Sequence, residues 1–353
     1  FLLDLVGSKR ATPILVAYAS GFRAQTIGRV VSSPFERSVE SAVDQGIEFL
    51  LQQQDKDGFW REFDLAPGAS ESWTTAWVGW CLTKSALDSP ALQIQVRESI
   101  RRAAAALWHS RLADGWGYNR STGPDADSSA WVLRFLSACG IKLAAASFLA
   151  PYIDPSGGVH TFREPGFGSW TEAHDDVAAN VGLALLNDTA PQPLATRIRH
   201  RSASRFPSRT FWWSTQTYGV AWTIRFLGAG GGLSHMIRER TQNWIAELPE
   251  ADSSFELAHR LIAAFETGCC SCKSVALVNH LLNLTGLQGW PASSHLLVPP
   301  HDGGDRPLPN PELRGLLTTS ICVCVLSEWL IANHLGQSSR LAYFSSRRSA
   351  GFR

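Results

Sequence analysis

Methionine and charge of either sign are scarce in this sequence. Only one of its 353 residues is methionine, charged residues make up 18%, and the formal net charge is +1. A near-neutral chain lacks the electrostatic footprint of a nucleic-acid-binding protein, so we expect no nucleic-acid partner. We find no apolar run of the roughly 18 residues that would cross a bilayer. Residues 1–21 also lack the charge order and cleavage site of a signal peptide.

The seven cysteines are odd in number and irregularly spaced, and most of them lie within apolar helical runs. Such cysteines are typical of a reduced, intracellular protein, so we expect a cytoplasmic location. Cys269, Cys270 and Cys272 offer thiolates, but no second cluster of matching type accompanies them. We therefore expect buried or turn cysteines and no zinc site.

Helical periodicity dominates the chain, and no segment shows a convincing strand pattern. Six segments are amphipathic with charged faces: 38–54, 95–111, 141–153, 193–203, 234–248 and 272–286. Each is followed by a turn rich in Gly, Pro or Asp and then by a segment that is apolar nearly all round: 70–85, 125–140, 171–186, 210–227, 252–267 and 314–330. Because a helix that is apolar on every side should be buried, the second set is predicted to form the interior.

The alternation predicts an all-α fold, an (α/α)6 double ring of six inner and six outer helices with repeats of about 50 residues. An open α-solenoid is the structural alternative, but its inner helices would need a more polar concave face. The fourth outer segment is polar and broken at 197–209, which suggests an irregular ring there. We divide the chain into an N-terminal helical segment packing on the barrel (1–36), the barrel domain (37–335) and a basic C-terminal tail (336–353).

Tryptophan is abundant, with 14 residues, and it recurs where an outer segment gives way to an inner one. The turns are Asp57-Gly58-Phe59-Trp60, Asp114-Gly115-Trp116, Gly168-Ser169-Trp170 and Gly289-Trp290. A glycine allows the tight turn, and the tryptophan that follows can pack across neighbouring repeats. We therefore interpret Trp60, Trp116 and Trp170 as structural residues.

Two short motifs resemble those of the class II terpene cyclases, the family of squalene–hopene cyclase and the diterpene cyclases. The stretch QQQDKDGFW (52–60) resembles their Gln–Trp repeat, in which a Gln precedes Asp-Gly-x-Trp and ties successive repeats together. The stretch DADSSAW (125–131) resembles their Asp-x-Asp-Asp-Thr-Ala motif, with Ser128 in place of the third Asp and Ser129 in place of Thr. Family members usually place the site between two barrels, and this chain is long enough for one. Its cavity must therefore be smaller, closed by loops or completed by a partner, and the oligomeric state stays open.

The resemblance implies an enzyme that protonates an alkene or epoxide of a linear isoprenoid and cyclises it through carbocations in an aromatic-lined cavity. Asp127 matches the family's proton donor and Asp125 its supporting acid. The acid must hold its proton at neutral pH, and both burial and a neighbouring carboxylate raise an Asp pKa. The helix dipole opposes this by about 0.3–1 kcal/mol. The alternative is that one of the two acids only caps a helix.

Aromatic faces can stabilise a migrating cation without reacting as nucleophiles. Trp131 lies four residues after Asp127 and therefore on the same face of the predicted helix. The further candidates are aromatic residues of the apolar segments: Trp73, Trp77, Trp80, Phe135, Trp212, Trp213, Tyr218 and Trp222. The alternative for each is that it is an ordinary core residue.

A second acidic helix start, TEAHDDVAAN (171–180), occupies the position equivalent to DADSS. We expect His174 to hydrogen-bond the acid pair, and Asp175 or Asp176 to hold a metal or a leaving proton. Capping of the helix by its first-turn acids is the alternative. The protonation chemistry requires no cofactor, whereas a diphosphate substrate would favour Mg²⁺ and basic groups, with Arg134, Arg163 and Arg209 as candidates.

Other helical barrels provide rival functions. Lanthionine cyclases hold zinc with Cys, Cys and His; the stretch around Cys81 resembles part of that pattern, but their Cys-His pair followed by Gly is absent. Protein prenyltransferase β-subunits use an Asp-x-Cys pair, which is absent too. Double-ring glycosidases and polysaccharide lyases place tryptophans in open clefts and usually need longer chains. A non-catalytic lipid-binding or scaffold barrel also stays open, as does peripheral contact with a membrane.

Overall fold

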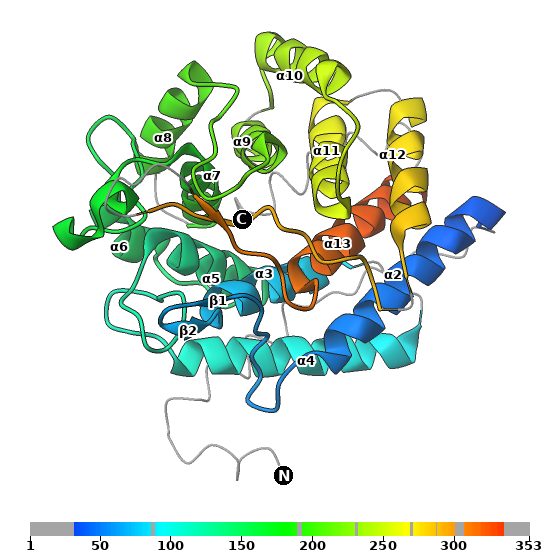
Figure 1. Cartoon of the computed structure of the whole chain (residues 1–353), viewed down its shortest axis with the longest axis horizontal. Coiled ribbons are helices and arrows are strands. Elements are labelled where there is room, and N and C mark those ends of the chain that lie inside the picture. Colours follow the sequence, from blue (N-terminus) through cyan, green and yellow to red (C-terminus); the bar gives the residue numbers. More distant parts are fainter. Residues whose placement is uncertain are drawn as a thin grey trace.

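The protein is described by a computed structural model that covers residues 32–85, 89–188, 193–229, 232–268, 271–286, 288–300 and 307–334. Helices form most of this structure and surround a common centre (Figure 1), which confirms the predicted all-α class. The strands within these ranges form two short antiparallel pairs. β1 (Asp64–Leu65) pairs with β2 (Gly68–Ala69), and β3 (Leu297–Val298) pairs with β4 (Leu308–Pro309).

Six helices contact one another in a closed circle within the described part of the chain. They are α3 (Ser72–Leu82), α5 (Ala126–Ala138), α7 (Asp175–Leu185), α9 (Gln216–Ala229), α11 (Ser254–Thr267) and α13 (Leu316–His334). Each packs against the next, and α13 packs against α3 to close the circle. Every residue of α3 is buried, as expected for a helix that is apolar on nearly every side.

The amphipathic helices lie outside this circle: α2 (Pro34–Gln52), α4 (Pro90–His109), α6 (Ala145–Leu149), α8 (Pro193–Ser204), α10 (His235–Glu247) and α12 (Ser271–Leu284). They pack on inner helices, for example α2 on α13, and α8 on both α7 and α9 (Figure 1). This order supports the double ring, whose exact (α/α)6 form stays an interpretation. The stretch 197–209 is helical only to Ser204, where α8 ends, and residues 205–209 are not helical. A second irregular place is α6, a five-residue helix extended by a 3₁₀ turn at Ala150–Tyr152.

The first described helix begins slightly before the predicted barrel boundary. α2 starts at Pro34 behind a capping box, in which the Ser33 hydroxyl accepts the Glu36 backbone N–H and the Glu36 carboxylate accepts the Ser33 N–H. Residues 34–36 therefore belong to the barrel rather than to a preceding segment. The rest of the predicted N-terminal segment up to residue 31, and the predicted basic tail, lie outside the described residues.

The tryptophan turns repeat one scheme of hydrogen bonds. The Trp60 indole N–H donates to the Leu50 carbonyl of the preceding outer helix at 2.7 Å, and its backbone N–H donates to the Thr75 hydroxyl of the next inner helix at 2.9 Å. The same pair of bonds recurs at Trp116 with Leu107 and Ser129, and at Trp290 with Leu281 and Thr319. Each of these three turns thus joins its outer helix to the inner helix that follows. Trp170 departs from the scheme, because it is half-buried and its indole donates to the Pro299 carbonyl at 2.7 Å.

Gln54 links the first two outer helices. Its side-chain amide donates to the Gly58 carbonyl at 2.9 Å and to the Ser99 carbonyl of α4 at 3.0 Å. The Ser99 hydroxyl in turn donates to the Gln54 side-chain oxygen at 2.8 Å. Gln54, one of three glutamines in the 52–60 stretch, therefore reaches the next repeat.

We expect Gly115→Ala to lower the free energy of unfolding by about 1–3 kcal/mol. Gly115 has a φ of +136°, and a Cβ atom there would lie 2.4 Å from the Ser129 hydroxyl that receives the Trp116 backbone N–H. Gly123→Ala is the control, since a Cβ at that position meets nothing within 4 Å. Urea unfolding measures both variants, and equal midpoints would contradict the importance of this turn.

α13 is long and apolar enough to cross a membrane by length and composition, contrary to the expectation that no segment is. Nearly all of its apolar stretch is buried inside the protein, where it packs against α2, α3 and α11. Its apolar character is therefore explained by its place in the inner circle.

Candidate active site

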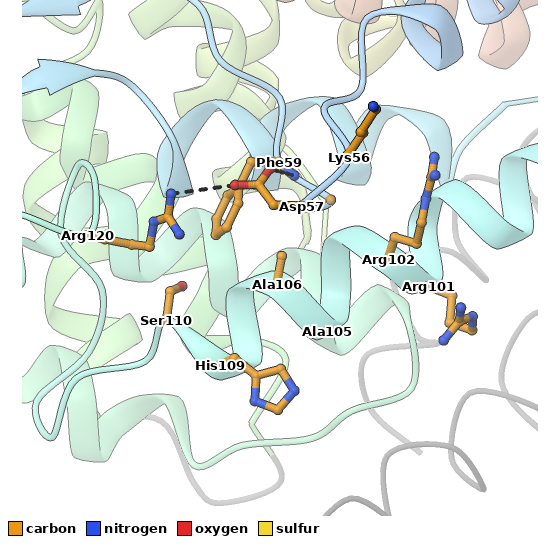
Figure 2. A pocket seen from close by; sticks show the side chains of 11 residues that line it. Lys56, Asp57, Phe59, Arg101, Arg102, Ala105, Ala106, His109, Ser110 and Arg120 are labelled. Atoms are coloured by element: carbon orange, nitrogen blue, oxygen red, sulfur yellow. Dashed lines mark hydrogen bonds and ion pairs between the residues drawn. The ribbon is translucent and has the colours of Figure 1, made fainter. Parts of the chain in front are cut away.

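A hollow of about 410 Å³ on the outer surface does not have the character of an isoprenoid site. It lies between the turn at residues 56–59 and helix α4, outside the inner circle (Figure 2). Charged side chains dominate its lining, among them Lys56, Asp57, Arg101, Arg102 and Arg120. A hydrocarbon chain would gain little by leaving water for such a wall. The acid pair singled out by the sequence lies elsewhere, at the start of α5.

Asp125 caps α5. Its backbone is extended, and its side chain accepts the Ser128 backbone N–H at 2.7 Å. The residue is buried, and desolvation raises the pKa of its carboxyl to about 6 although the Ser128 N–H acts in the opposite direction. The capping alternative therefore describes the geometry of Asp125.

Asp127 makes different contacts, because both of its carboxyl oxygens bond to side chains of other helices. The Trp73 indole N–H of α3 donates to Oδ2 at 2.7 Å, and the Asn180 amide of α7 donates to Oδ1 at 2.7 Å. Burial raises the pKa of Asp127 to about 7, Asp125 raises it further, and the two N–H donors lower it. The residue is half-buried, so part of its surface stays accessible. Such a group can hold a proton at neutral pH and still release it.

Asn180 is a site residue that the sequence reasoning missed. It is completely buried in α7, and its amide also donates to the Asp127 backbone carbonyl at 3.3 Å. Its side-chain oxygen accepts a hydrogen bond from Arg134 at 2.7 Å. With the oxygen turned to Arg134, the NH₂ group has to face Asp127. The available signal was a lone amide in the apolar stretch VAANVGLALL (177–186), because a buried amide needs partners.

Two of the predicted aromatic residues lie at the site, because Trp73 bonds to Asp127 and Trp213 packs beside Trp73. The Trp73 ring centroid lies 6.1 Å from that of Trp213, which stacks on Tyr218 at 4.3 Å. Trp73 and Trp213 keep 6% and 4% of their surface exposed. Trp212 and Trp213 precede α9 rather than lying on it, so their placement on the fourth inner helix was wrong.

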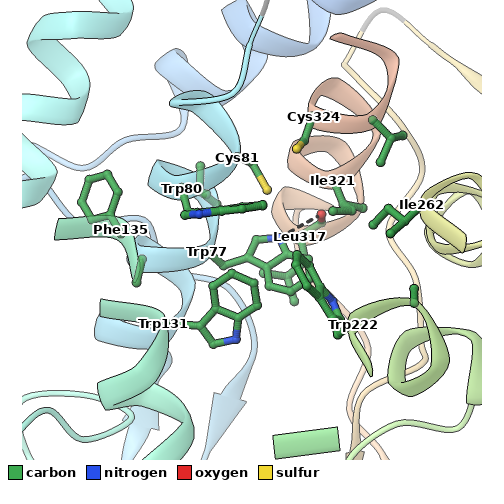
Figure 3. Packing of buried hydrophobic residues seen from close by; sticks show 14 of the residues in the cluster. Trp77, Trp80, Cys81, Trp131, Phe135, Trp222, Ile262, Leu317, Ile321 and Cys324 are labelled. Carbon is green, nitrogen blue, oxygen red and sulfur yellow. Dashed lines mark hydrogen bonds between the residues drawn. The ribbon is translucent and has the colours of Figure 1, made fainter. Parts of the chain in front are cut away.

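Trp77, Trp80, Trp131 and Trp222 form the packed centre of the inner circle (Figure 3), whereas Trp212 is half-buried and donates to the Thr161 hydroxyl at 3.2 Å. The Trp77 ring lies 4.7 Å from Trp131 and 5.9 Å from Trp222, and none of the three has exposed surface. Phe135 lies away from these rings (Figure 3) and packs on Gly79, where a Cβ atom would come within 2.6 Å of its ring. Phe135 is therefore a core residue between α3 and α5, and its predicted place in the cavity wall is wrong.

His174 does not bond to the acid pair as expected. One ring nitrogen pairs with the Thr161 hydroxyl at 2.9 Å, and the other pairs with the Ser169 carbonyl at 3.2 Å. The ring also stacks on Phe211, with centroids 3.9 Å apart. Burial lowers the pKa of His174 to about 4, so the ring is neutral at neutral pH. It joins the segment before α7 to the 3₁₀ turn at Pro165–Thr171.

The two acids at the start of α7 have separate partners. Asp175 forms an ion pair with Arg205 at 3.1 Å. Asp176 is buried and accepts the backbone N–H groups of Phe211 and Trp212, both at 2.9 Å. Burial raises the pKa of Asp176 to about 7. The geometry assigns these acids to loop attachment and not to a shared metal or diphosphate site.

Arg134 lies in the packed centre rather than at a position where a diphosphate could reach it. Its guanidinium carbon lies 4.1 Å from the ring centroid of Trp131 and 4.7 Å from those of Trp80 and Trp222. The expected diphosphate role of Arg134 is therefore wrong. The guanidinium also occupies ring faces of Trp131 and Trp222 that were expected to hold a carbocation.

One group of three ligand-type side chains is found among the described residues, with atoms within 4.8 Å of one another: Asp252, Glu256 and His295. The His295 ring nitrogens pair with the hydroxyls of Ser214 at 2.9 Å and Ser253 at 2.6 Å. Glu256 forms an ion pair at 2.7 Å with an arginine of its own helix. Asp252 lies 3.0 Å from one of the His295 ring nitrogens, so each of the three side chains has a partner within the protein. The side chains of Cys269, Cys270 and Cys272 lie outside the described part of the chain.

The fold is similar to that of solved terpene cyclase structures, although the sequence alone has no match. No family model matches the sequence, and no curated protein matches it. Among solved structures, the ligand-free type II terpene cyclase MstE from Scytonema superposes with a TM-score of 0.73 at 22% sequence identity. The match covers 84% of this chain and 99% of that one. This chain has the fold of a type II terpene cyclase.

Two further structures agree with this result. A variant of MstE in complex with its substrate, geranylgeranyl dihydroxybenzoate, gives a TM-score of 0.72 at 21% identity and covers 84% of this chain and 99% of its own. A protein from Actinoplanes gives 0.68 at 23% identity and covers 82% and 98%. The resemblance drawn from the two motifs is thus confirmed for the fold. At these identities the activity has to be argued from the site itself.

Proposed function

We propose that the protein is a class II terpene cyclase and that Asp127 starts the cyclisation by protonating a linear isoprenoid. The observation that carries the proposal is the state of this carboxyl group. Burial raises its pKa to about 7, and N–H donors from two helices, those of Trp73 and Asn180, bond to its two oxygens. The terpene-cyclase fold supports the same proposal.

The proposed first step is transfer of the Asp127 proton to an alkene carbon or to an epoxide oxygen of the substrate. The step leaves a carboxylate on Asp127 and a carbocation on the substrate. The N–H groups of Trp73 and Asn180 already point at both carboxyl oxygens, so they stabilise the negative charge as it develops without reorganising. The two N–H donors thereby make Asp127 a strong enough acid to protonate an alkene, which is a very weak base.

The later steps use the substrate's own double bonds. Each attacks the cation in turn and forms a carbon–carbon bond, until loss of a proton or capture of water ends the reaction. Trp73 bonds to Asp127 and packs beside Trp213, so we place the stabilisation of the cation at these two rings. The remaining rings pack behind these two. Trp77 and Trp131 contact Trp73, Tyr218 stacks on Trp213, and Trp222 packs on Trp131.

The proposed substrate is a linear isoprenoid, and the protonation itself needs no cofactor. MstE binds a geranylgeranyl chain attached to dihydroxybenzoate, so we include aryl-bearing chains beside prenyl diphosphates. Mg²⁺ would assist only a diphosphate substrate, by shielding its phosphate charge. Asp175, Asp176 and Arg134 are committed to other contacts, so the geometry favours substrates without a diphosphate.

Incubation in D₂O tests the proposal. The purified protein is given linear C10 to C30 prenyl diphosphates and geranylgeranyl dihydroxybenzoate, and products are analysed by chromatography with mass spectrometry. We expect a cyclic isomer of one substrate that gains one deuterium in D₂O, because the acidic proton of Asp127 exchanges with solvent. A product without deuterium would exclude protonation as the first step. Binding without turnover would favour the lipid-binding alternative.

A further inference from the structure

Arg134 carries a buried positive charge that takes no direct part in the proposed proton transfer. The residue is 3% exposed, and its guanidinium lies over the rings of Trp80, Trp131 and Trp222. None of the ion pairs formed by the described residues includes it, although a buried cation normally requires a partner. Three ring faces and the Asn180 oxygen take the place of a carboxylate.

The hydrogen bond from Arg134 decides which way the Asn180 amide faces. If the amide were flipped, its oxygen would lie against Asp127 and could accept the O–H of the protonated carboxyl group. The acidic proton would then be held by Asn180 instead of facing the substrate. A guanidinium has only donors, so it accepts no bond from the amide NH₂ and keeps the oxygen on its own side.

We propose that Arg134 is a positioning residue for Asp127, acting through Asn180. It keeps the acidic proton available to the substrate, and its positive charge favours the carboxylate that remains after proton transfer. The inference rests on the proposed function for the identity of the proton acceptor. The geometry that carries it, Arg134 to Asn180 to Asp127, spans helices α5 and α7 and can be tested without a substrate.

Several other charged or titratable groups face this pair. Tyr218 and Arg225 approach Arg134 from α9, Cys81 approaches from α3, and Asp176 of α7 acts on Asp127. Burial raises the pKa of Tyr218 and of Cys81 well above their ordinary values, so both stay neutral near pH 7. Despite its burial, Arg225 has a raised pKa because carboxylates from α11 and α13 pair with it. Asp125 and Asp176 titrate in the range of Asp127, so the readout must be specific to one residue.

Residue-specific titration by carbon-13 NMR provides this readout. The carboxyl carbons of aspartate are labelled, and the Asp127 signal is assigned by its loss in Asp127→Asn. Arg134→Gln removes the charge but keeps an N–H donor, and Arg134→Lys keeps the charge without the planar fork. We expect Arg134→Gln to raise the titration midpoint of Asp127 by about 0.5–1 pH unit, because a favourable positive charge is lost. Arg134→Lys should leave the midpoint near that of the wild type and shift the Asn180 side-chain amide signals.

Arg199→Gln is the matched control. Arg199 also lies over an aromatic ring, with 5.1 Å to the Phe226 centroid, and donates to one carbonyl, that of Leu227, at 2.6 Å. It belongs to the outer helix α8, so its loss should leave the Asp127 midpoint unchanged. An unchanged midpoint in Arg134→Gln would overturn the proposal. If that variant does not fold, Arg134→Lys decides, and Asn180 amide signals identical to those of the wild type would overturn the positioning role.

Turnover gives a second, separable test. Where the wild type cyclises a substrate, we expect both Arg134 variants to lower kcat by about 10–100-fold with little change in KM. The alkaline limb of the rate profile should move to higher pH only in Arg134→Gln. A purely structural role would reduce the folded fraction and leave this limb in place. If the wild type shows no turnover, the proposed function fails, while the titration of Asp127 still decides the role of Arg134.

Discussion

Asp127→Asn should lower the rate of cyclisation by about 10²–10⁴-fold or more, while the protein stays folded. The substitution keeps the shape and a hydrogen-bonding group but removes the acidic proton that faces the substrate. Asp125→Asn is the matched control and should cost less activity, because Asp125 caps α5 and acts on the reaction only through the pKa of Asp127. Asn is nearly as good a cap as Asp, so both variants should fold. Steady-state rates of product formation measure the difference, and a wild-type rate in Asp127→Asn would refute the assignment.

The same substitution should change stability with pH in a defined direction. Burial raises the pKa of Asp127 from 3.8 to about 7, so the folded state binds this proton more tightly than the unfolded state does. The contribution of Asp127 to stability is therefore full below pH 4 and is lost as the pH rises toward 7. Asp127→Asn lacks this loss, so urea unfolding should show the variant gaining stability relative to the wild type between about pH 4 and pH 7. The rate of the wild-type enzyme should fall as the pH rises through 7, because the acid becomes ionised.

Trp77→Ala should lower the free energy of unfolding by about 3–5 kcal/mol. The Trp77 ring has no exposed surface and packs against Trp131 and Trp222 at the centre of the inner circle. Its indole N–H also donates to the Ser320 hydroxyl of α13 at 2.9 Å, so the substitution leaves a cavity and removes a hydrogen bond between α3 and α13. The midpoint of urea unfolding should fall accordingly.

Trp108→Ala is the control for this second prediction. Trp108 is half-buried on the outer helix α4, where one face of its ring lies under Arg111. Solvent can fill part of the space that the ring leaves, so the loss should be clearly smaller than at Trp77. A loss of similar size in the two variants would show that Trp77 borders open space instead of filling the centre.

The alternation of helix types could be predicted from the sequence because it depends on local composition. Inner segments such as 70–85 and 314–330 are apolar on nearly every side, and this alone requires burial. The glycine–tryptophan turns at Trp60 and Trp116 were recognised for a similar reason, since a tight turn followed by a large ring is a local feature. The pair of acids at the start of α5 was also visible, because capping and acid chemistry both favour a carboxyl group near a helix start.

What the sequence did not determine is the direction in which each polar side chain points. Asp125 and Asp127 are two residues apart, yet one caps its own helix and the other bonds to α3 and α7. His174 was expected at the acids and instead joins Thr161 to Ser169. These outcomes depend on neighbours far away in the chain, which come close only when the inner helices close into a circle.

By itself, then, the sequence determined an all-α chain of alternating helices with an acidic pair at the mouth of a buried helix. Only the tertiary structure decided that the Asp127 carboxyl group bonds to Trp73 of α3 and to Asn180 of α7, 53 positions later. It also showed that Arg134, which was expected at a diphosphate site, lies over the rings of Trp80, Trp131 and Trp222. The physical reason is that hydrophobic periodicity depends only on how much of a helix is buried. The pKa and the partners of a buried polar group depend instead on the few side chains that packing brings within hydrogen-bonding distance.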